Sequence, residues 1–268
     1  MFINKITQIN DMYELTDELN YLRKIGYSGE KDNIYYDYIY KWARIIKIVK
    51  ILNLSTNSKI LEIGGGLSPL QFIFANNNCK IINLDQEFNS SWFPTNGKYY
   101  IRASEDFVKE SNSNLQNINY VQGNIMNTIK EIPSESIDIA IDTCAMHIFI
   151  NDELINEITR ILKPNGYLLS VGDIANPYLG KNDNEFLYPK DFQKAISINS
   201  KLKLIEPFDY DSWDNELKTL DNIVIRKNVD YNDLSLMNMK SDPKHIPYHN
   251  IPTYPIHIWT ATYLLKKY

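Results

Sequence analysis

Hydrophobic positions recur at regular spacings in the first part of the chain, and those spacings predict helices. Within residues 10–26, Leu15, Leu19 and Leu22 are separated by four and three positions, which places them on one face of a helix. Residues 34–54 are densely apolar, contain no Pro or Gly, and end in a turn composition. The pattern therefore predicts two helices ahead of the first strand.

A strand, a glycine turn and a helix come next. Lys59–Ile63 is a short apolar run that leads into three consecutive glycines and then into the helix-like stretch 67–74. After a turn rich in asparagine, residues 80–84 predict a second strand, which ends at Asp85. Two strands joined through a helix form a βαβ unit, so we expect them to be parallel with a right-handed crossover.

The same alternation continues through the rest of the chain. Further strands are expected at 119–122, 137–142, 167–171, 202–206 and 258–265, with helices at 152–162 and from residue 189, and a turn at 164–166. This pattern predicts an α/β fold with a doubly wound, Rossmann-like sheet that is mostly parallel and has an antiparallel last strand. We expect one domain, made of a helical N-terminal extension (1–55), a core (56–208), an insertion (209–255) and a closing strand (256–268).

Composition and charge narrow the class of protein. The chain carries a formal net charge of -5, whereas a constitutive nucleic-acid binder usually has a basic face. The most apolar stretch is interrupted by Lys47 and Lys50, and the first residues lack a secretory signal pattern, so we expect a cytoplasmic protein without a membrane segment. Cys79 and Cys144 are too few for a disulfide framework and are expected to be buried or to line a site.

The glycine turn is the first candidate for chemistry. Glycines between a strand and a helix let the main chain approach a ligand closely, and the first helical turn offers unpaired N–H groups. Dinucleotide-binding turns need a third glycine where this chain has Pro69, which weakens the interpretation as a pyrophosphate site. Asp85 follows Gly64 by about 20 residues, the separation at which an acidic residue binds ribose hydroxyls. Without that context, Asp85 is explained as a helix cap or a turn residue.

An ordered set of motifs carries a family resemblance. It consists of Leu61–Gly66, Asp85 at the end of the second strand, Gly123–Ile125 after the third, Asp142 at the fourth and Leu162–Gly166 before the fifth. Together these motifs resemble those of class I S-adenosylmethionine-dependent methyltransferases, over roughly residues 34–206. The resemblance implies S-adenosylmethionine as the cofactor and a methyl group as the transferred group.

The resemblance also implies which residues meet each part of the cofactor. Gly64 and Gly66 would lie against its methionine part, with Glu62 nearby. Asp85 would accept hydrogen bonds from the ribose hydroxyls, which a carboxylate can do with both oxygens.

The adenine would be held after the third strand. Asn124 would hydrogen-bond to it and Ile125 would pack against it. The family often has Asp where this chain has Asn124, whose amide oxygen can still accept from the adenine amino group. The complete cofactor-binding set that the resemblance implies is Glu62, Gly64, Gly65, Gly66, Asp85, Gln86, Gly123, Asn124, Ile125, Asp142 and Thr143.

Two residues are candidates for acid–base chemistry. His147 follows the fourth strand, at the edge of the sheet where ligands bind in such folds, and is the candidate base for a hydroxyl acceptor. A structural histidine at the start of the next helix is an equally open interpretation. Asp173, just after the predicted fifth strand, either orients a histidine, binds a substrate hydroxyl or caps a loop.

The insertion is rich in histidine and aromatic residues. Prolines lie among His245, His249 and His257 and break any helix that would place two of them on one face, so no metal site is predicted. The aromatic side chains either stack on a sugar or nucleotide substrate or pack the insertion onto the sheet. We expect segments 1–45 and 209–255 to cover the substrate.

The leading functional prediction is methyl transfer to a small molecule by in-line displacement. A hydroxyl of a sugar or sugar nucleotide is preferred on polarity and aromatic content, and a small amine is a second possible acceptor. Base-methylating enzymes generally have an Asp/Asn-Pro-Pro-aromatic motif after the fourth strand, where this chain reads Asp142-Thr-Cys-Ala, so we expect no nucleic-acid partner. A non-catalytic S-adenosylmethionine-binding protein and a nicotinamide dehydrogenase are competing functions for the same fold. Nothing in the sequence predicts the oligomeric state.

Overall fold

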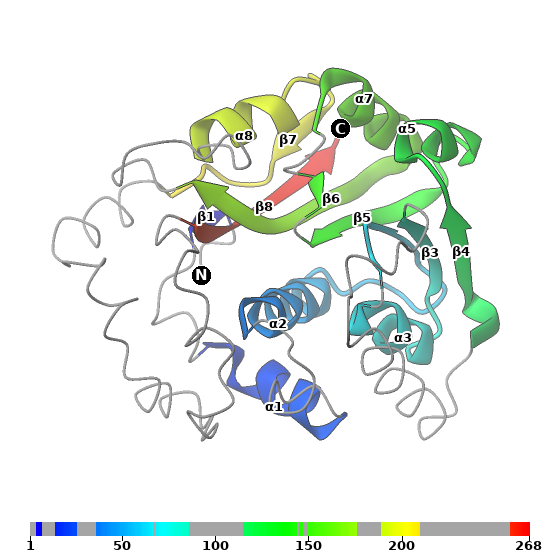
Figure 1. Cartoon of the computed structure of the whole chain (residues 1–268). Helices are drawn as coiled ribbons and strands as arrows, with labels where there is room; N and C mark the ends of the chain where they lie inside the picture. The colour runs from blue at the N-terminus through cyan, green and yellow to red at the C-terminus, as the bar shows by residue number, and fades with distance from the viewer. Residues whose placement is uncertain are drawn as a thin grey trace, which may run out of the picture.

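A β-sheet with helices on both faces forms the described part of the chain (Figure 1). This computed structural model describes residues 4–6, 14–25, 36–66, 68–85, 115–143, 145–146, 150–175, 189–209 and 258–268. The predicted site residues Gln86 and His147, and the insertion beyond residue 209, lie outside the described residues.

The sheet has the strand order β1-β8-β6-β5-β2-β3-β4, and β7 also pairs with β8. The pairs from β6 to β4 are parallel, whereas β8 runs antiparallel to β6, β1 and β7. The predicted doubly wound, mostly parallel sheet with an antiparallel last strand is confirmed. The strands are β1 (Lys5–Ile6), β2 (Lys59–Ile63), β3 (Lys80–Asp85), β4 (Ile118–Gln122), β5 (Ile137–Thr143), β6 (Leu162–Ala175), β7 (Leu202–Leu204) and β8 (Ile258–Lys267).

Side chains that alternate along the strands enter two separate hydrophobic cores. On one face, Ile60 and Ile139 pack with α1, α2 and α3. On the other face, Leu61 and Ala140 pack with α7 and α8. Both faces of the central strands are covered, which explains why β2 and β5 are apolar almost throughout. The helices are α1 (Thr16–Lys24), α2 (Tyr36–Ile51), α3 (Pro69–Asn76), α5 (Ile125–Thr128), α7 (Asp152–Ile161) and α8 (Pro189–Ile196), with short 3-10 turns η3 (Leu115–Asn117) and η4 (Ile129–Glu131).

The fifth predicted strand is longer than its local pattern indicates. The expected turn at 164–166 interrupts the pairing near the start of β6: Asn165 has φ +66°, and the register with β5 shifts between Leu162, which pairs with Ile137, and Tyr167, which pairs with Ile139. Regular pairing then continues beyond the predicted end of the strand, to Ala175. Asp173, placed after the strand by the sequence, therefore lies inside it and is paired in register with Thr260 of β8. The ladder between β6 and β8 joins segments about ninety residues apart in the sequence, so a local pattern could not show where β6 ends.

Two further elements differ from expectation. The sequence does not predict β1, which is a strand because Lys5 and Ile6 pair with Thr262 and Ala261 of β8. β7 is shorter than the predicted strand over 202–206. Cys79 is buried, as expected, and Cys144 lies outside the described residues. None of the described helices combines the length and the apolar character that crossing a bilayer requires.

Candidate functional site

Three neighbouring strands end at one edge of the sheet and bring the predicted cofactor residues together. Parallel pairing aligns Ile63 of β2 with Leu84 of β3, and Asp85 with Gln122 of β4. The glycine turn, Asp85 and Gly123 therefore follow one another across the carboxyl ends of these strands. This is the edge at which open α/β sheets bind ligands.

Each of the first two glycines in the turn meets a different neighbour. Gly64 has φ +61°, and a Cβ built there would lie 2.3 Å from the Cβ of Ala145. A Cβ on Gly65 would lie 2.8 Å from the Oδ1 atom of Asn83 and 2.8 Å from the Cγ atom of Glu62. No real Cβ tolerates such distances, so the turn packs against its surroundings on these sides.

Gly66 presents the open side of the turn. Its φ of +48° is in the left-handed region that favours glycine, but among the described residues a Cβ there would meet only Asp85 Oδ2, at 3.5 Å. The backbone N–H of Gly66 donates to that same oxygen over 2.5 Å. Asp85 is also anchored through its backbone, because its carbonyl accepts from the Gly123 N–H at 2.9 Å. The glycine turn and the acid are thus physically joined.

Glu62 lies under the turn as a buried carboxyl group. Its side chain is 2% exposed, and its strand position pairs with Asn83 on β3. Burial raises the pKa of Glu62 to about 8; the negative charge of Asp85 acts in the same direction, and a hydrogen bond with Ser68 opposes both. Glu62 Oε1 and Asn83 Oδ1 are buried and have no hydrogen-bond partner among the described residues. A donor or a positive charge at this point would satisfy both oxygens.

Asp142 has a structural environment of its own. One carboxylate oxygen accepts from the backbone N–H groups of Ala145 and Met146, at 2.9 and 2.8 Å. The other accepts from the Ser170 hydroxyl over 2.5 Å. These bonds hold the chain after β5 in place and so position Ala145 against Gly64. Thr143 is a β5 residue whose buried Oγ1 has no hydrogen-bond partner within the described residues.

The loop after β4 is shaped by Gly123 and Asn124. Gly123 has φ +146°, and Asn124 caps α5 by accepting the N–H of Met126 at 2.9 Å. The side chain of Asn124 is exposed and that of Ile125 is half-buried, so both are accessible at this edge.

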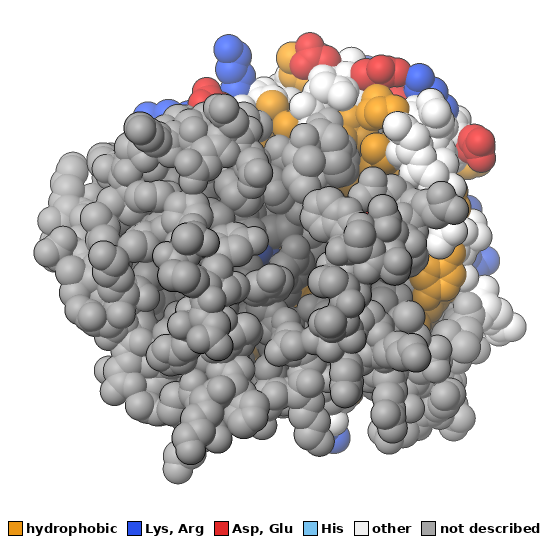
Figure 2. Space-filling view, in the orientation of Figure 1, with side chains coloured by type: hydrophobic (Ala, Val, Ile, Leu, Met, Phe, Trp, Pro, Cys, Tyr) orange, Lys and Arg blue, Asp and Glu red, His pale blue; other side chains and the backbone are white. Residues whose placement is uncertain are grey.

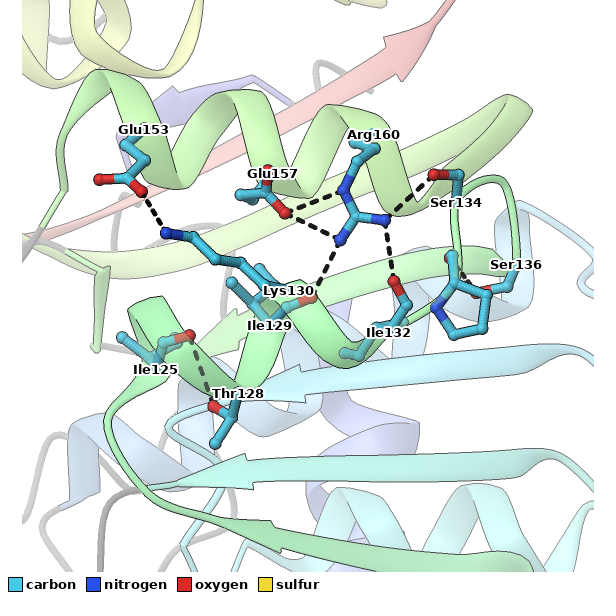
Figure 3. Close-up of polar contacts among 11 residues, drawn as sticks. Ile125, Thr128, Ile129, Lys130, Ile132, Ser134, Ser136, Glu153, Glu157 and Arg160 are labelled. Carbon is cyan, nitrogen blue, oxygen red and sulfur yellow. Dashed lines mark hydrogen bonds and ion pairs between the residues drawn. The ribbon is translucent and has the colours of Figure 1, made fainter.

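A cluster on α7 holds the segment that follows this loop. Figure 3 shows Arg160 reaching the carbonyls of Ile132 and Ile129, at 2.9 and 3.1 Å, while Glu157 accepts from its guanidinium at 2.8 Å. The guanidinium thus adds a charged donor to two backbone carbonyls at the end of η4, one of which, that of Ile129, also accepts from the Ile132 N–H. The position of α5 is therefore tied to the helix on the same side of the sheet.

The remaining predicted residues are placed only in part. His147 and Gln86 lie outside the described residues, as do His245, His249 and His257. Asp173 is on β6, which is separated from β2 by β5 in the sheet order. In the part of the chain that the structure describes, no three His, Cys, Asp or Glu residues gather as a metal site would require.

Sequence reasoning missed Asn83 and Gln71, two buried amides beside the turn. Asn83 was detectable in principle, since it is a polar residue in the otherwise apolar run Lys80–Leu84. Its partner on α3 is twelve residues earlier, and only folding brings the two amides together.

Comparison with protein families and curated sequences gives independent information about this site. A family model described as a methyltransferase domain matches residues 54–219, which include the glycine turn and Asp85. Probable polyketide synthase 38 of Dictyostelium discoideum is 28% identical over 160 residues, which are 51% of this chain and 5% of that protein. Probable polyketide synthase 39 of the same organism is 29% identical over 139 residues, which are 47% of this chain and 4% of that protein. The chain thus spans about a twentieth of the length of these relatives.

Solved structures with the same fold have low sequence identity. The cyclase SpnF superposes with a TM-score of 0.57 at 15% identity and covers 100% of this chain and 97% of that chain. A putative sarcosine dimethylglycine methyltransferase from Galdieria sulphuraria gives a TM-score of 0.51 at 13% identity, covering 94% and 98%. At these identities the likeness establishes the fold alone, and one fold carries different reactions.

Proposed function

We propose, from the premise that this chain belongs to the methyltransferase domain family, that it methylates a hydroxyl group of a small molecule, such as a sugar or a sugar nucleotide. The chain is an S-adenosylmethionine-dependent methyltransferase, and S-adenosylmethionine is the methyl donor. The acceptor and the roles of individual residues are the content of the proposal.

The contact between Gly66 and Asp85 carries the assignment of the cofactor site. It joins the turn that faces the methionine part to the acid that accepts from the ribose, within one hydrogen bond of 2.5 Å. A carboxylate accepts hydrogen bonds at both oxygens, which suits recognition of the two ribose hydroxyls. The side of Gly66 on which the described residues leave room for a Cβ is the side on which a bound nucleoside would lie.

Glu62 fits the positively charged end of the cofactor. Its buried Oε1 has no hydrogen-bond partner in the described residues, and a buried carboxyl group without compensation is costly. An ammonium group above the turn would stabilise the ionised carboxylate and would release the proton that burial retains. Gly64 and Gly65 have no side chains, so the main chain of the turn can pass close to the ammonium group.

The other implied residues have separate roles. Asn124 and Ile125 would line the adenine on one side, where capping of α5 orients Asn124. Asp142 would act through the chain it holds after β5, since its carboxylate is already engaged by three donors. Thr143 and Gln86 complete the proposed lining, together with Gly123.

The chemistry asks little of the protein beyond orientation and proton removal. The bound sulfonium supplies an activated methyl group. The chain has to exclude water and align the acceptor oxygen with that group. A hydroxyl must also lose its proton as the new bond forms, and we assign this step to His147, with Asp173 orienting the base or the acceptor.

A small-molecule acceptor is favoured over nucleic acid by charge. The chain has a formal net charge of -5, which opposes binding to a phosphate backbone. Among the described side chains visible in Figure 2, acidic and basic groups are interspersed along the upper edge rather than separated into a basic stripe. We propose that residues 1–45 and 209–255 cover the acceptor.

A polyketide intermediate is the second candidate acceptor. About half of this chain is similar to parts of probable polyketide synthases, at 26–29% identity. Such an acceptor would be methylated in the same cleft, and the choice of base would then depend on the reacting atom.

Binding of the cofactor is tested by calorimetry with S-adenosylmethionine, S-adenosylhomocysteine and NAD. We expect the first two to bind and NAD not to bind. Asp85→Asn should weaken S-adenosylhomocysteine binding about 10- to 100-fold, because hydrogen bonds to a charged group contribute about 1.5–3 kcal/mol. Asp138→Asn is the matched control, since Asp138 pairs with Lys163 and the Lys59 N–H at the opposite edge of the sheet. Normal binding by Asp85→Asn would refute the site assignment.

The acceptor is tested by transfer of a labelled methyl group to metabolite pools, supplemented with sugar nucleotides, small amines and polyketide thioesters. We expect label in a hydroxyl compound with the wild-type protein. His147→Ala should lose most of this transfer while retaining S-adenosylhomocysteine binding. Full transfer by His147→Ala would remove His147 from the mechanism, and label only in thioesters would select the second candidate.

A further inference from the structure

Two buried amide side chains lie next to the glycine turn, between the sheet and α3. Asn83 of β3 is 2% exposed and Gln71 of α3 is 0% exposed. They contact each other directly, with Asn83 Nδ2 donating to Gln71 Oε1 at 3.0 Å. Ile81 and Phe74 belong to the core on this face of the sheet, and the buried Glu62, paired in register with Asn83, is a polar neighbour.

Both amides converge on one backbone carbonyl. Asn83 Nδ2 donates to the oxygen of Gly66 at 2.9 Å, and Gln71 Nε2 donates to the same oxygen at 3.2 Å. Gln71 Nε2 also donates to the carbonyl of Ser68 at 2.9 Å. Gly66 therefore donates its N–H to Asp85 and accepts at its carbonyl from two side chains, one on β3 and one on α3.

A role limited to starting α3 does not explain this arrangement. Ser68 already caps the helix, because its hydroxyl accepts the N–H of Leu70 at 3.1 Å, and Pro69 occupies the first turn. Burying two amides in an apolar layer brings a desolvation cost that Leu and Met at these positions would avoid. What the amides add is a fixed orientation of the Gly66 carbonyl, which restrains the backbone of this residue.

We propose that Asn83 and Gln71 are positioning residues for the cofactor: they fix the carbonyl of Gly66 and, through the backbone of that residue, its N–H, and thereby hold the Asp85 carboxylate in the orientation that receives the ribose. This inference rests on the proposed contact between Asp85 and the ribose. Neither amide has to touch the cofactor. Both act through Gly66, which has a left-handed φ of +48° and no side chain to restrain it.

The test is a double-mutant cycle on S-adenosylhomocysteine binding, measured by calorimetry on the full chain. Asn83→Leu keeps the size of the side chain but removes the donor, and we expect about tenfold weaker binding. Gln71→Met should weaken binding in the same direction but less, because its bond to Gly66 is the longer of the two. Asp85→Asn combined with Asn83→Leu should bind about as weakly as Asp85→Asn alone.

Two controls separate positioning from general destabilisation. Thr159→Val removes a buried bond of 2.7 Å to the Ile155 carbonyl on α7, so it should lower the melting temperature without changing affinity. A 2′,3′-dideoxy analogue of S-adenosylhomocysteine lacks the hydroxyls that Asp85 receives, and its affinity should be insensitive to Asn83→Leu. The test also works if Asn83→Leu lowers the stability of the protein, because the affinities of S-adenosylhomocysteine and of the analogue are compared on the same variant.

The outcomes distinguish this inference from the proposed function. If the wild-type protein does not bind S-adenosylhomocysteine, or if Asp85→Asn binds it normally, the proposed site is wrong and the inference falls with it. If Asp85→Asn weakens binding but Asn83→Leu does not, or if the two effects multiply fully in the double variant, only the positioning role is overturned.

Discussion

Replacing Gly64 by alanine tests the packing of the glycine turn most directly. An L-residue at φ +61° costs about 1–2 kcal/mol of backbone strain. The added methyl group would also lie 2.3 Å from the Cβ of Ala145, an overlap that forces neighbouring atoms to shift. Overpacking of this kind costs about 1–3 kcal/mol. The free energy of unfolding should therefore fall by about 2–5 kcal/mol.

Gly66→Ala is the matched comparison because it shares only the first of these effects. Its φ of +48° imposes similar backbone strain, but within the described part of the chain the new methyl group would meet only Asp85 Oδ2 at 3.5 Å, an ordinary contact. We expect a loss of about 1–2 kcal/mol in stability. Affinity for S-adenosylhomocysteine should fall more than stability suggests, because the methyl group occupies the open side of the turn.

Urea unfolding followed by circular dichroism measures both losses from the shift in midpoint. Ala145→Gly in the Gly64→Ala background removes the overlapping methyl group, so it should restore the overpacking part of the loss and leave the backbone part. Ala145→Gly alone provides the fourth corner of this cycle. A midpoint for Gly64→Ala equal to that of the wild type, or no recovery in the double variant, would contradict close packing of Gly64 against Ala145.

Two further predictions concern the groups around this turn. Because the folded-state pKa of Glu62 is about 8 against an ordinary value of 4.5, the folded protein keeps a proton that the unfolded chain loses, and the free energy of unfolding should fall as pH rises through this interval. Glu62→Gln should remove this dependence of the unfolding free energy on pH, which is at most about 1.4 kcal/mol per pH unit. Urea unfolding of both proteins at about pH 5.5 and about pH 7.5 measures it. An equal change in unfolding free energy between the two pH values in both proteins would contradict the reasoning. Arg160→Met should destabilise the protein by about 1–3 kcal/mol, because two carbonyls of the η4 segment lose a charged donor. In the same urea assay Lys130→Met, which removes the exposed pair with Glu153, should leave the midpoint unchanged, and an equal shift in both variants would exclude the bonds to the carbonyls as the cause (Figure 3).

Elements whose patterns are local agree closely with the sequence. β2 has the predicted bounds, and β3 ends at Asp85 as expected. α7 ends one residue before its prediction, and its start is set by the side chain of Asn151, which accepts the N–H of Leu154. Hydrophobic spacing, a cap and a turn all act within a few residues, so a single sequence contains the information that defines these elements.

Elements that depend on distant partners were not predictable in the same way. The length of β6 follows from its ladder with β8, and β1 exists through two pairings with β8. The sequence did not show that the Asp142 carboxylate accepts from Ser170 and from two backbone groups after β5. Each case depends on a hydrogen-bond partner that only the folded chain brings near.

Some features of the candidate site were likewise readable from the sequence, whereas others depend on the folded chain. The residue types at the strand ends, three glycines and an acid one strand later, were readable from the order of residues, because parallel strands place their carboxyl ends at a common edge. The tertiary structure alone decided that the Gly66 N–H donates to Asp85, that Asn83 and Gln71 donate to the carbonyl of the same residue, and that Glu62 is buried enough to retain its proton. Distance and desolvation are properties of packing in three dimensions, and a linear sequence does not contain either quantity explicitly.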